Sequence, residues 1–181
     1  TPNGKKYITV DAALEGSDEL TVMYWDDRIL EDYKVFAKSS GKEMENYVRE
    51  MKTKHGVPNS NIAIDADGVG GYLSSYIVGA KDFKNGSAPL EERDANGKPF
   101  KPNYQNLKTQ CEYKAAKAIN ERKYWLKAVK TQTEKDLFIQ EMQWIKKYDI
   151  DNDKVLKTMP KKLIKQNISR SPDRWDGLKM R

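Results

Sequence analysis

The chain has 181 residues, of which 33% are charged and 38% are hydrophobic, and its formal net charge at pH 7 is +6. This length suits one domain, because a chain of this size buries roughly 70% of its unfolded surface, and its four Trp and ten Tyr argue against wholesale disorder. The sequence contains neither a run near the roughly 20 apolar residues of a membrane span nor a signal peptide at its start, so we expect a cytosolic protein that does not bind membranes.

The N-terminal part of the sequence predicts an antiparallel meander. Residues 6–14 begin with a β-branched and aromatic run, which predicts a central strand. Residues 20–25 and 29–36 have the same character and are bounded by turn residues. Because the connections between these segments are short, neighbouring strands are expected to pair antiparallel.

A helix is then predicted to lead into a fourth strand. Ser39 can cap a helix over residues 39–54, and Gly56 can end it. Residues 61–66 form a short apolar run, typical of a buried strand. A right-handed crossover through the helix would place this strand parallel to the first.

The second half of the chain is predicted to be largely helical. Residues 68–78 predict a helix, and residues 81–103 are polar and rich in Gly, Pro and Asn, which predicts a long loop. Helical periodicity returns in residues 104–123 and 133–148, the second capped by Thr133.

The C-terminal end is predicted to contain a hairpin and a short helix. Residues 149–159 suit a hairpin, and Ser171 can cap a helix that has Pro172 in its first turn. Together the segments predict an α/β fold in which a mixed β-sheet, an antiparallel meander plus parallel strands, is flanked by helices.

Acidic residues occur where the predicted buried elements meet solvent. Asp11 lies near the end of the first strand, Asp65 near the end of the fourth, and Asp173 and Asp176 at the last helix start. Carboxylates that converge in a core repel one another, and hard divalent cations with oxygen ligands are the usual compensation. Two such ions roughly 3.5–4 Å apart can activate a water and stabilise the leaving oxygen in phosphodiester hydrolysis.

Each carboxylate also has a structural explanation. Asp11 could be a turn or edge residue, Asp65 lies in a good turn sequence, and Asp173 could complement the helix dipole. Asp67 is disfavoured as a ligand, because it is expected on the opposite side of an extended strand from Asp65, the partner of Asp11. The residues by themselves leave these alternatives open.

The basic residues are concentrated at the C-terminal end. Residues 154–181 contain nine Lys or Arg and two Asp. Such a patch can bind the phosphates of nucleic acid, which supply most sequence-independent affinity, although a solvated surface is the alternative. The candidates for phosphate contact are Lys161, Lys162, Lys165, Arg170 and Arg174.

Other features are interpreted as structural. Cys111 is the single cysteine, so it is expected to be a buried thiol outside any disulfide or thiolate metal site. His55 is expected to be a surface or capping residue at a helix end. No Gly-x-x-x-x-Gly-Lys-Ser/Thr motif occurs, so ATP binding by a phosphate loop is not expected. Three tryptophans are expected in the core: Trp125, Trp144 and Trp175.

Three segments together resemble the nuclease domain of tailed-bacteriophage terminase large subunits, which is ribonuclease H-like. Residues 8–13, Ile-Thr-Val-Asp-Ala-Ala, resemble the family's first strand with Asp-x-Ala, and residues 62–70 resemble its strand-Asp-x-x-Gly-x-Gly motif. Residues 169–178, Ser-Arg-Ser-Pro-Asp-Arg-Trp-Asp-Gly-Leu, resemble its closing Ser-Pro-Asp-x-x-Asp-Ala-Leu motif and follow a Lys-rich segment. The resemblance covers essentially the whole chain.

The resemblance implies a single nuclease domain over residues 1–181, as the C-terminal fragment of a larger ATPase–nuclease. It implies that Asp11 and Asp65 are the first two metal-binding and catalytic carboxylates. The third would be Asp173, which we rank first, or Asp176. The His that the family has at this end is missing here, where Pro172 occupies the corresponding neighbourhood. This puts His-assisted proton transfer in doubt.

The implied function is a metal-dependent endonuclease that cleaves double-stranded phage DNA with low sequence specificity during genome packaging, in the host bacterial cytoplasm. The implied cofactors are two Mg²⁺ or Mn²⁺ ions. The implied partners besides DNA are the terminase ATPase domain, the small terminase subunit and the portal. Two alternatives are a nuclease like the Holliday-junction resolvases, which would favour branched DNA, and a non-catalytic DNA-binding or motor-docking module.

Overall fold

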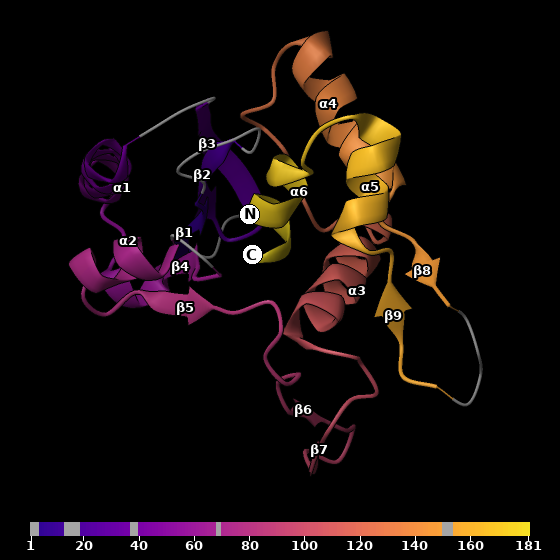
Figure 1. Cartoon of the computed structure of the whole chain (residues 1–181). Helices are drawn as coiled ribbons and strands as arrows, with labels where there is room; N and C mark the ends of the chain where they lie inside the picture. The colour runs from indigo at the N-terminus through magenta and orange to yellow at the C-terminus, as the bar shows by residue number, and fades with distance from the viewer. Residues whose placement is uncertain (1–3, 13–18, 37–39, 68–69, 150–153) are drawn as a thin grey trace.

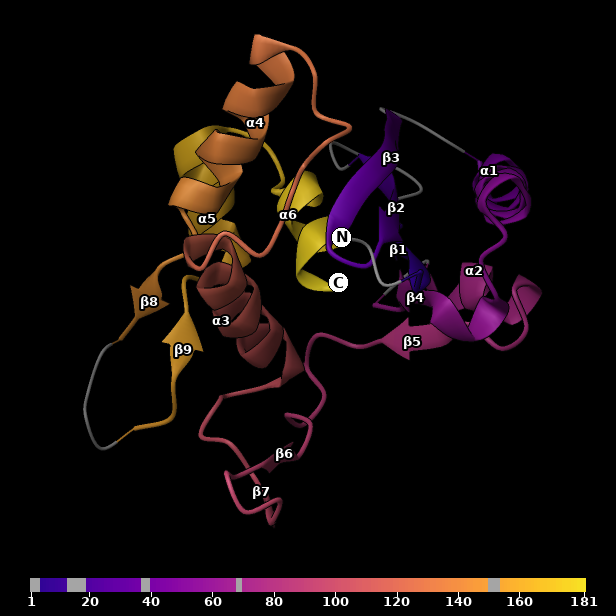
Figure 2. The same cartoon turned by 180° about the vertical axis from the view of Figure 1, so that it is seen from behind.

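A mixed sheet lies at the centre of the fold, with helices on both of its faces (Figure 1 and Figure 2). The computed structural model describes residues 4–12, 19–36, 40–67, 70–149 and 154–181. Within these residues the sheet has five strands in the order β3-β2-β1-β4-β5. β1, β2 and β3 pair antiparallel, whereas β4 pairs parallel with both β1 and β5. The predicted α/β class is therefore confirmed, including the meander and the parallel fourth strand.

The strands of this sheet are β1 (Lys6–Asp11), β2 (Leu20–Asp26), β3 (Ile29–Phe36), β4 (Ile62–Asp65) and β5 (Lys81–Phe83). The first strand ends earlier than predicted, and the last residues of that prediction, 13 and 14, lie outside the described residues. The prediction of one long loop over residues 81–103 is wrong, because β5 starts there. A strand of three residues has too short a pattern to be recognised, and it forms because the edge of β4 is available for pairing.

The same predicted loop also contains a small hairpin, formed by β6 (Glu92–Arg93) and β7 (Pro99–Phe100). A second hairpin, formed by β8 (Lys147–Tyr148) and β9 (Lys157–Thr158), agrees with the predicted one but begins two residues earlier. Figure 1 shows both hairpins extending away from the central sheet.

The helices are α1 (Gly41–His55), α2 (Gly70–Tyr76), α3 (Leu107–Asn120), α4 (Gln132–Gln143), α5 (Lys161–Ile168) and α6 (Asp173–Lys179). α5 was not predicted, and α4 is shorter than predicted because its C-terminal neighbours enter β8. α1 ends at Gly56 in the left-handed conformation, as expected.

Three predicted helix caps are wrong. Ser40 caps α1, while the predicted Ser39 lies outside the described residues. Thr131, not Thr133, caps α4 and forms a capping box with the third helical residue. At α6 the cap position is held by Pro172, which makes no side-chain cap hydrogen bond. At α1 and α4 the sequence offers two nearby hydroxyl residues that could each cap the helix, so packing decides which of them does.

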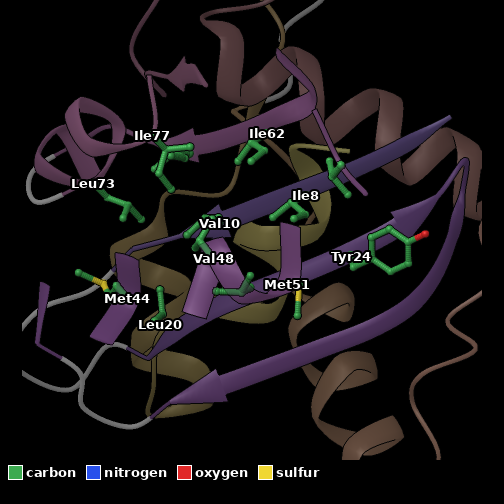
Figure 3. Close-up of a cluster of buried hydrophobic side chains, with 13 residues drawn as sticks. Ile8, Val10, Leu20, Tyr24, Met44, Val48, Met51, Ile62, Leu73 and Ile77 are labelled. Carbon is green, nitrogen blue, oxygen red and sulfur yellow. The ribbon is translucent and has the colours of Figure 1, made fainter. Parts of the chain in front are cut away.

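Alternation along the strands separates two hydrophobic clusters. One face of the sheet contributes Ile8, Val10, Leu20, Val22 and Ile62, among others, to a cluster with α1 and α2. Figure 3 shows Met44, Val48 and Met51 of α1 and Leu73 and Ile77 of α2 packed over these strand residues.

The opposite face packs against the C-terminal helices. Met23 and Trp25 of β2 cluster with Phe138 of α4 and with Trp175 and Leu178 of α6. Figures 1 and 2 agree that α6 lies between the sheet and the layer formed by α3, α4 and α5. This burial fixes α6 directly on the sheet.

The aromatic predictions have mixed outcomes. Trp175 is buried as expected, Trp144 is half-buried, and Trp125 is 59% exposed, so its assignment to the core is wrong. The backbone of Trp125 bonds Leu30 and Arg28 beside β3, while its ring lies near the ammonium of Lys127.

The remaining structural expectations concern one thiol and one imidazole. Cys111 is half-buried rather than fully buried, and burial raises the pKa of its thiol. His55 ends α1, where it stacks on Tyr24 and lies 3.3 Å from a carboxylate oxygen of Asp32. Among the helices described, none combines the length and apolarity that crossing a lipid bilayer requires.

Candidate metal centre

Strand alternation turns two of the predicted carboxylates toward α6. Val10 and Ile64 lie in the cluster covered by α1 and α2, so the residues that follow them, Asp11 and Asp65, point to the other face. Val10 and Ile64 are also partners in the parallel β1–β4 register. Asp11 and Asp65 are therefore side by side at the carboxyl ends of two neighbouring strands.

α6 adds two carboxylates on the same side of the sheet. Asp173 is its first residue, and Asp176 follows three positions later, which places both on one helix face. Carboxylate oxygens of Asp11, Asp173 and Asp176 all lie within 4.8 Å of one another, and all three residues are buried. Segments more than 150 residues apart in sequence thus meet in one acidic cluster.

The cluster lines a cavity of about 360 Å³. Its lining side chains come from the carboxyl ends of β1 and β4, the residues that follow β1, β4 and β5, and the helices α3, α5 and α6. They are Asp11, Ala12, Asp65, Asp67, Asn85, Lys108, Lys161, Asp173, Asp176 and Lys179. All four predicted acidic residues share it. The expectation that Asp67 lies on the opposite side from Asp65 is wrong, because residues two apart in an extended segment lie on the same side, and both residues line the cavity.

A close approach of α6 to the sheet makes this convergence possible. A Cβ at Gly177 would lie 3.2 Å from the sulfur of Met23 and 3.3 Å from Cγ2 of Thr21, so there is little room for any side chain here. The backbone N–H of Glu19 also donates to Oδ2 of Asp173 at 2.8 Å, which ties the start of α6 to the residue before β2.

Asp176 is held between two lysines. Lys161 Nζ lies 2.7 Å from Oδ2 of Asp176, and Lys179 Nζ lies 2.5 Å from Oδ1. Burial acts to raise the pKa of Asp176, but the two ammonium groups outweigh it and hold that pKa below its usual value. Lys179 was not identified from the sequence, whereas Lys161 was predicted as a phosphate contact.

The other members of the cluster resist ionisation. Burial and then the charge of Asp176 raise the pKa of Asp11 well above its usual value, against the opposing effects of Lys161 and Lys179. Burial likewise raises the pKa of Asp173. A hard divalent cation would relieve this repulsion, and a donor set of carboxylate oxygens suits Mg²⁺, Mn²⁺ or Ca²⁺. The residues therefore fit such an ion.

Asn85 organises the other side of the cavity. Its Nδ2 donates to Oδ2 of Asp65 at 2.9 Å and to Oδ2 of Asp67 at 2.8 Å, and its backbone N–H donates to Oδ2 of Asp67 at 3.1 Å. Asn85 was not predicted from the sequence, because it follows β5, which was itself not predicted. Recognising β5 would have placed Asn85 just beyond a strand end, as for Asp11 and Asp65.

The predicted phosphate contacts are dispersed. The guanidinium groups of Arg170 and Arg174 both bond Glu141 on α4, and Arg174 also lies 3.1 Å from Glu19. Arg174 is only 8% exposed. These two arginines therefore form ion pairs with carboxylates that do not line the cavity. Lys162 is exposed and Lys165 half-buried on α5, and neither lines the cavity.

These features define a ribonuclease H-like α/β fold with an acidic cavity at the carboxyl ends of β1 and β4. The nuclease domain of the large terminase subunit gp2 of bacterial virus Sf6 is similar, with a TM-score of 0.76, 17% identity, and coverage of 99% of this chain and 88% of that chain. A mutant of that domain with calcium gives 0.75 at 18% identity with the same coverage, and the same mutant was also solved with manganese and beta-thujaplicinol.

The large terminase nuclease from thermophilic phage G20c is also similar, with a TM-score of 0.60, 13% identity, and coverage of 99% of this chain and 81% of that chain. No protein-family model and no curated protein matches the sequence. At these identities the likeness demonstrates a shared fold, and the fold implied by the sequence resemblance is confirmed.

Proposed function

We propose that the chain is the nuclease domain of a phage terminase large subunit, residues 1–181 of which form one unit of a larger ATPase–nuclease. In this proposal it cleaves double-stranded DNA during genome packaging in the host bacterial cytoplasm. The supporting observation is that carboxylate oxygens of Asp11, Asp173 and Asp176 lie within 4.8 Å of one another, in a cavity shared with Asp65. The shared fold of the Sf6 and G20c nucleases supports the same reaction class.

Two divalent ions, Mg²⁺ or Mn²⁺, are the proposed cofactors. Asp11, Asp173 and Asp176 would hold one ion, and Asp65 beside Asp11 would hold the second. Such ions supply positive charge that activates a water and stabilises the leaving oxygen in phosphodiester hydrolysis. The solved Sf6 domains with manganese and with calcium are compatible with this donor set.

The chain's own residues prepare the carboxylates for this task. Lys161 and Lys179 keep Asp176 ionised, and their bonds fix both of its oxygens. Asn85 holds the oxygens of Asp65 and Asp67 in one orientation through its amide. The ligands are thus oriented before substrate arrives, which avoids a cost of reorganisation during the reaction.

The proposed contacts to DNA are directed at the backbone. Lys162 and Lys165 lie on α5, on the same helix as Lys161, which lines the cavity and whose ammonium also holds Asp176. Backbone contacts position a duplex without reading its bases, which agrees with low sequence specificity. Arg170 and Arg174 are left out, because their guanidinium groups bond Glu141. The small terminase subunit, the portal and the ATPase domain are proposed partners from the family resemblance.

The test is plasmid nicking and linearisation in Mn²⁺. Asp11→Asn, Asp65→Asn and Asp173→Asn are each expected to lower cleavage by at least roughly a hundredfold, because each removes a metal ligand. Asp136→Asn on α4, outside the cavity lining, serves as the matched control and should cleave like the parent. Full activity in Asp11→Asn would overturn the proposal.

Two outcomes would favour the alternative functions. A strong preference for four-way junctions over linear duplex would support a nuclease of the resolvase type. Cleavage absent at all Mn²⁺ concentrations, with DNA binding retained, would support a non-catalytic module. Because Mg²⁺ sites commonly take phosphate oxygens as ligands, Mn²⁺ calorimetry should be run with and without DNA.

A further inference from the structure

Among the described residues, three lysines line the cavity, and they differ in how they are held. Lys161 and Lys179 lie 2.7 Å and 2.5 Å from the oxygens of Asp176. Lys108 comes from a different element, the first turn of α3. The acidic group that it approaches is Glu112, with 3.7 Å between Nζ and Oε1.

This separation leaves the donors of Lys108 available. A distance of 3.7 Å is too long for an N–H···O hydrogen bond. Glu112 is satisfied by other groups, because Oε1 accepts from the indole N–H of Trp175 at 3.3 Å and Oε2 accepts from the hydroxyl of Thr158. The side chain of Lys108 is 18% exposed, compared with 1% for that of Glu112. Its ammonium can therefore donate a hydrogen bond to an anion at the cavity wall.

The other charged groups that line the cavity indicate what the ammonium of Lys108 would bind. In the described chain, five carboxyl groups and three ammonium groups line the cavity, so its side chains include more acidic than basic groups. The two proposed divalent ions would more than offset that excess, but they would be held by the carboxylates, and Asp176 already engages two of the three lysines. A cation that is not engaged by the proposed metal ligands is the group best suited to bind the incoming phosphate.

We propose that Lys108 is a substrate-contacting residue that donates to a phosphate oxygen of the DNA backbone at the cavity. The inference rests on the proposed nuclease function and adds a residue outside the basic C-terminal segment. Lysine acts on phosphate as a point charge, so this contact carries no base preference.

The experiment measures kcat, KM and their salt dependence for duplex cleavage in Mn²⁺. Lys108→Gln should lower kcat/KM about tenfold, the size expected for one lost charged hydrogen bond. It should also reduce the slope of log(kcat/KM) against log salt by about 1. Lys108→Arg should retain most activity. Lys117→Gln makes the same change on the same helix at a side chain that is 77% exposed, and it should match the parent.

A double variant distinguishes a contact of Lys108 with DNA phosphate from an indirect effect of Lys108 on the buried carboxylate of Glu112. If Lys108 acts only by neutralising Glu112, then Lys108→Gln with Glu112→Gln should recover parental kcat/KM and salt slope; under our proposal it stays as impaired as Lys108→Gln. The double variant carries no unpaired buried carboxylate at position 112, so it tests the idea even if Lys108→Gln folds poorly. An inactive parent overturns the nuclease function itself. An active parent whose kinetics Lys108→Gln leaves unchanged overturns this inference alone.

Discussion

The backbone N–H of Trp175 donates a 2.8 Å hydrogen bond to Oε2 of Glu141, which joins α4 to the middle of the segment that carries the two carboxylates of α6. Glu141 is fully buried, and its other oxygen accepts from Arg170 and Arg174. Burial raises the pKa of Glu141, against the opposing bonds from Arg170 and Trp175. We infer that Glu141 positions α6 relative to the sheet.

Glu141→Gln should therefore lower both the free energy of unfolding and the affinity for Mn²⁺. Removing one charge from a buried ion pair costs about 3 kcal/mol, which urea denaturation in EDTA measures. Calorimetry measures the Mn²⁺ affinity. Glu121→Gln, at a carboxylate whose side chain is 38% exposed and does not line the cavity, is the control. Normal Mn²⁺ affinity in a destabilised but folded Glu141→Gln protein would show that Glu141 supports the fold without positioning the ligands.

Asp11→Asn should stabilise the metal-free protein. Burial and the charge of Asp176 raise the pKa of Asp11, so the folded chain retains a proton that the unfolded chain releases above a pH of about 4. The contribution of Asp11 to stability therefore falls as pH rises through its raised pKa. Asparagine has no such dependence.

The measurement is the melting temperature in EDTA at several pH values. The difference between the melting temperatures of Asp11→Asn and the parent should grow as the pH rises from about 4 through the raised pKa of Asp11. Added Mn²⁺ should raise the melting temperature of the parent but not that of the variant, because only the parent binds the ion in its folded state. A variant less stable than the parent at neutral pH in EDTA would contradict the reasoning.

Asp176→Asn should have the opposite effect in the same cavity. It leaves Lys179, which is 4% exposed, without its carboxylate, and breaking such a pair costs about 3 kcal/mol or more. Because the pKa of Asp176 is lowered, its contribution is present above the usual carboxyl pKa and is lost as pH falls through the lowered value. Urea denaturation in EDTA at neutral pH, run beside Asp11→Asn, should give shifts of opposite sign.

Asn85→Ala should weaken Mn²⁺ binding about tenfold or more without large loss of stability. The variant loses the amide that orients Asp65 and Asp67, and residues that orient metal ligands typically contribute 10- to 100-fold in affinity. Asn96→Ala, at an exposed position in the β6–β7 hairpin, is the matched control. Equal Mn²⁺ affinity in the two variants would rule out an orienting role for Asn85.

Thr131→Ala should lower the free energy of unfolding by about 1 kcal/mol, the usual contribution of a helix cap. Thr131 accepts from the N–H of Glu134, and Glu134 bonds back to the N–H of Thr131. The bond from Tyr33 and those from Thr131 lower the pKa of Glu134 to about 2. Thr133→Ala, inside the helix, should change stability little, so urea denaturation of the pair identifies the cap.

The sequence by itself determined the first four strands and the ends at which Asp11 and Asp65 lie. Both depend on local patterns, since β-branched runs and period-two alternation can be recognised within a short stretch of sequence. Local signals were less decisive for caps, because Thr131 and Thr133 both offer a hydroxyl near the start of α4. The acidic residues of α6 were singled out by their place at a predicted helix start, and the family resemblance then implied their role as metal ligands.

Only the tertiary structure decided which groups meet. β5 exists because β4 offers it an edge, and with β5 comes Asn85 at the cavity. The lysines that hold Asp176 and the burial of Glu141 against α6 are also absent from local patterns. Arg174 bonds Glu19 across 155 positions of the chain, a contact that excludes it from the exposed basic patch. Pairing and charge compensation depend on distances in space, and a one-dimensional pattern records such distances only where neighbours in sequence remain neighbours in the fold.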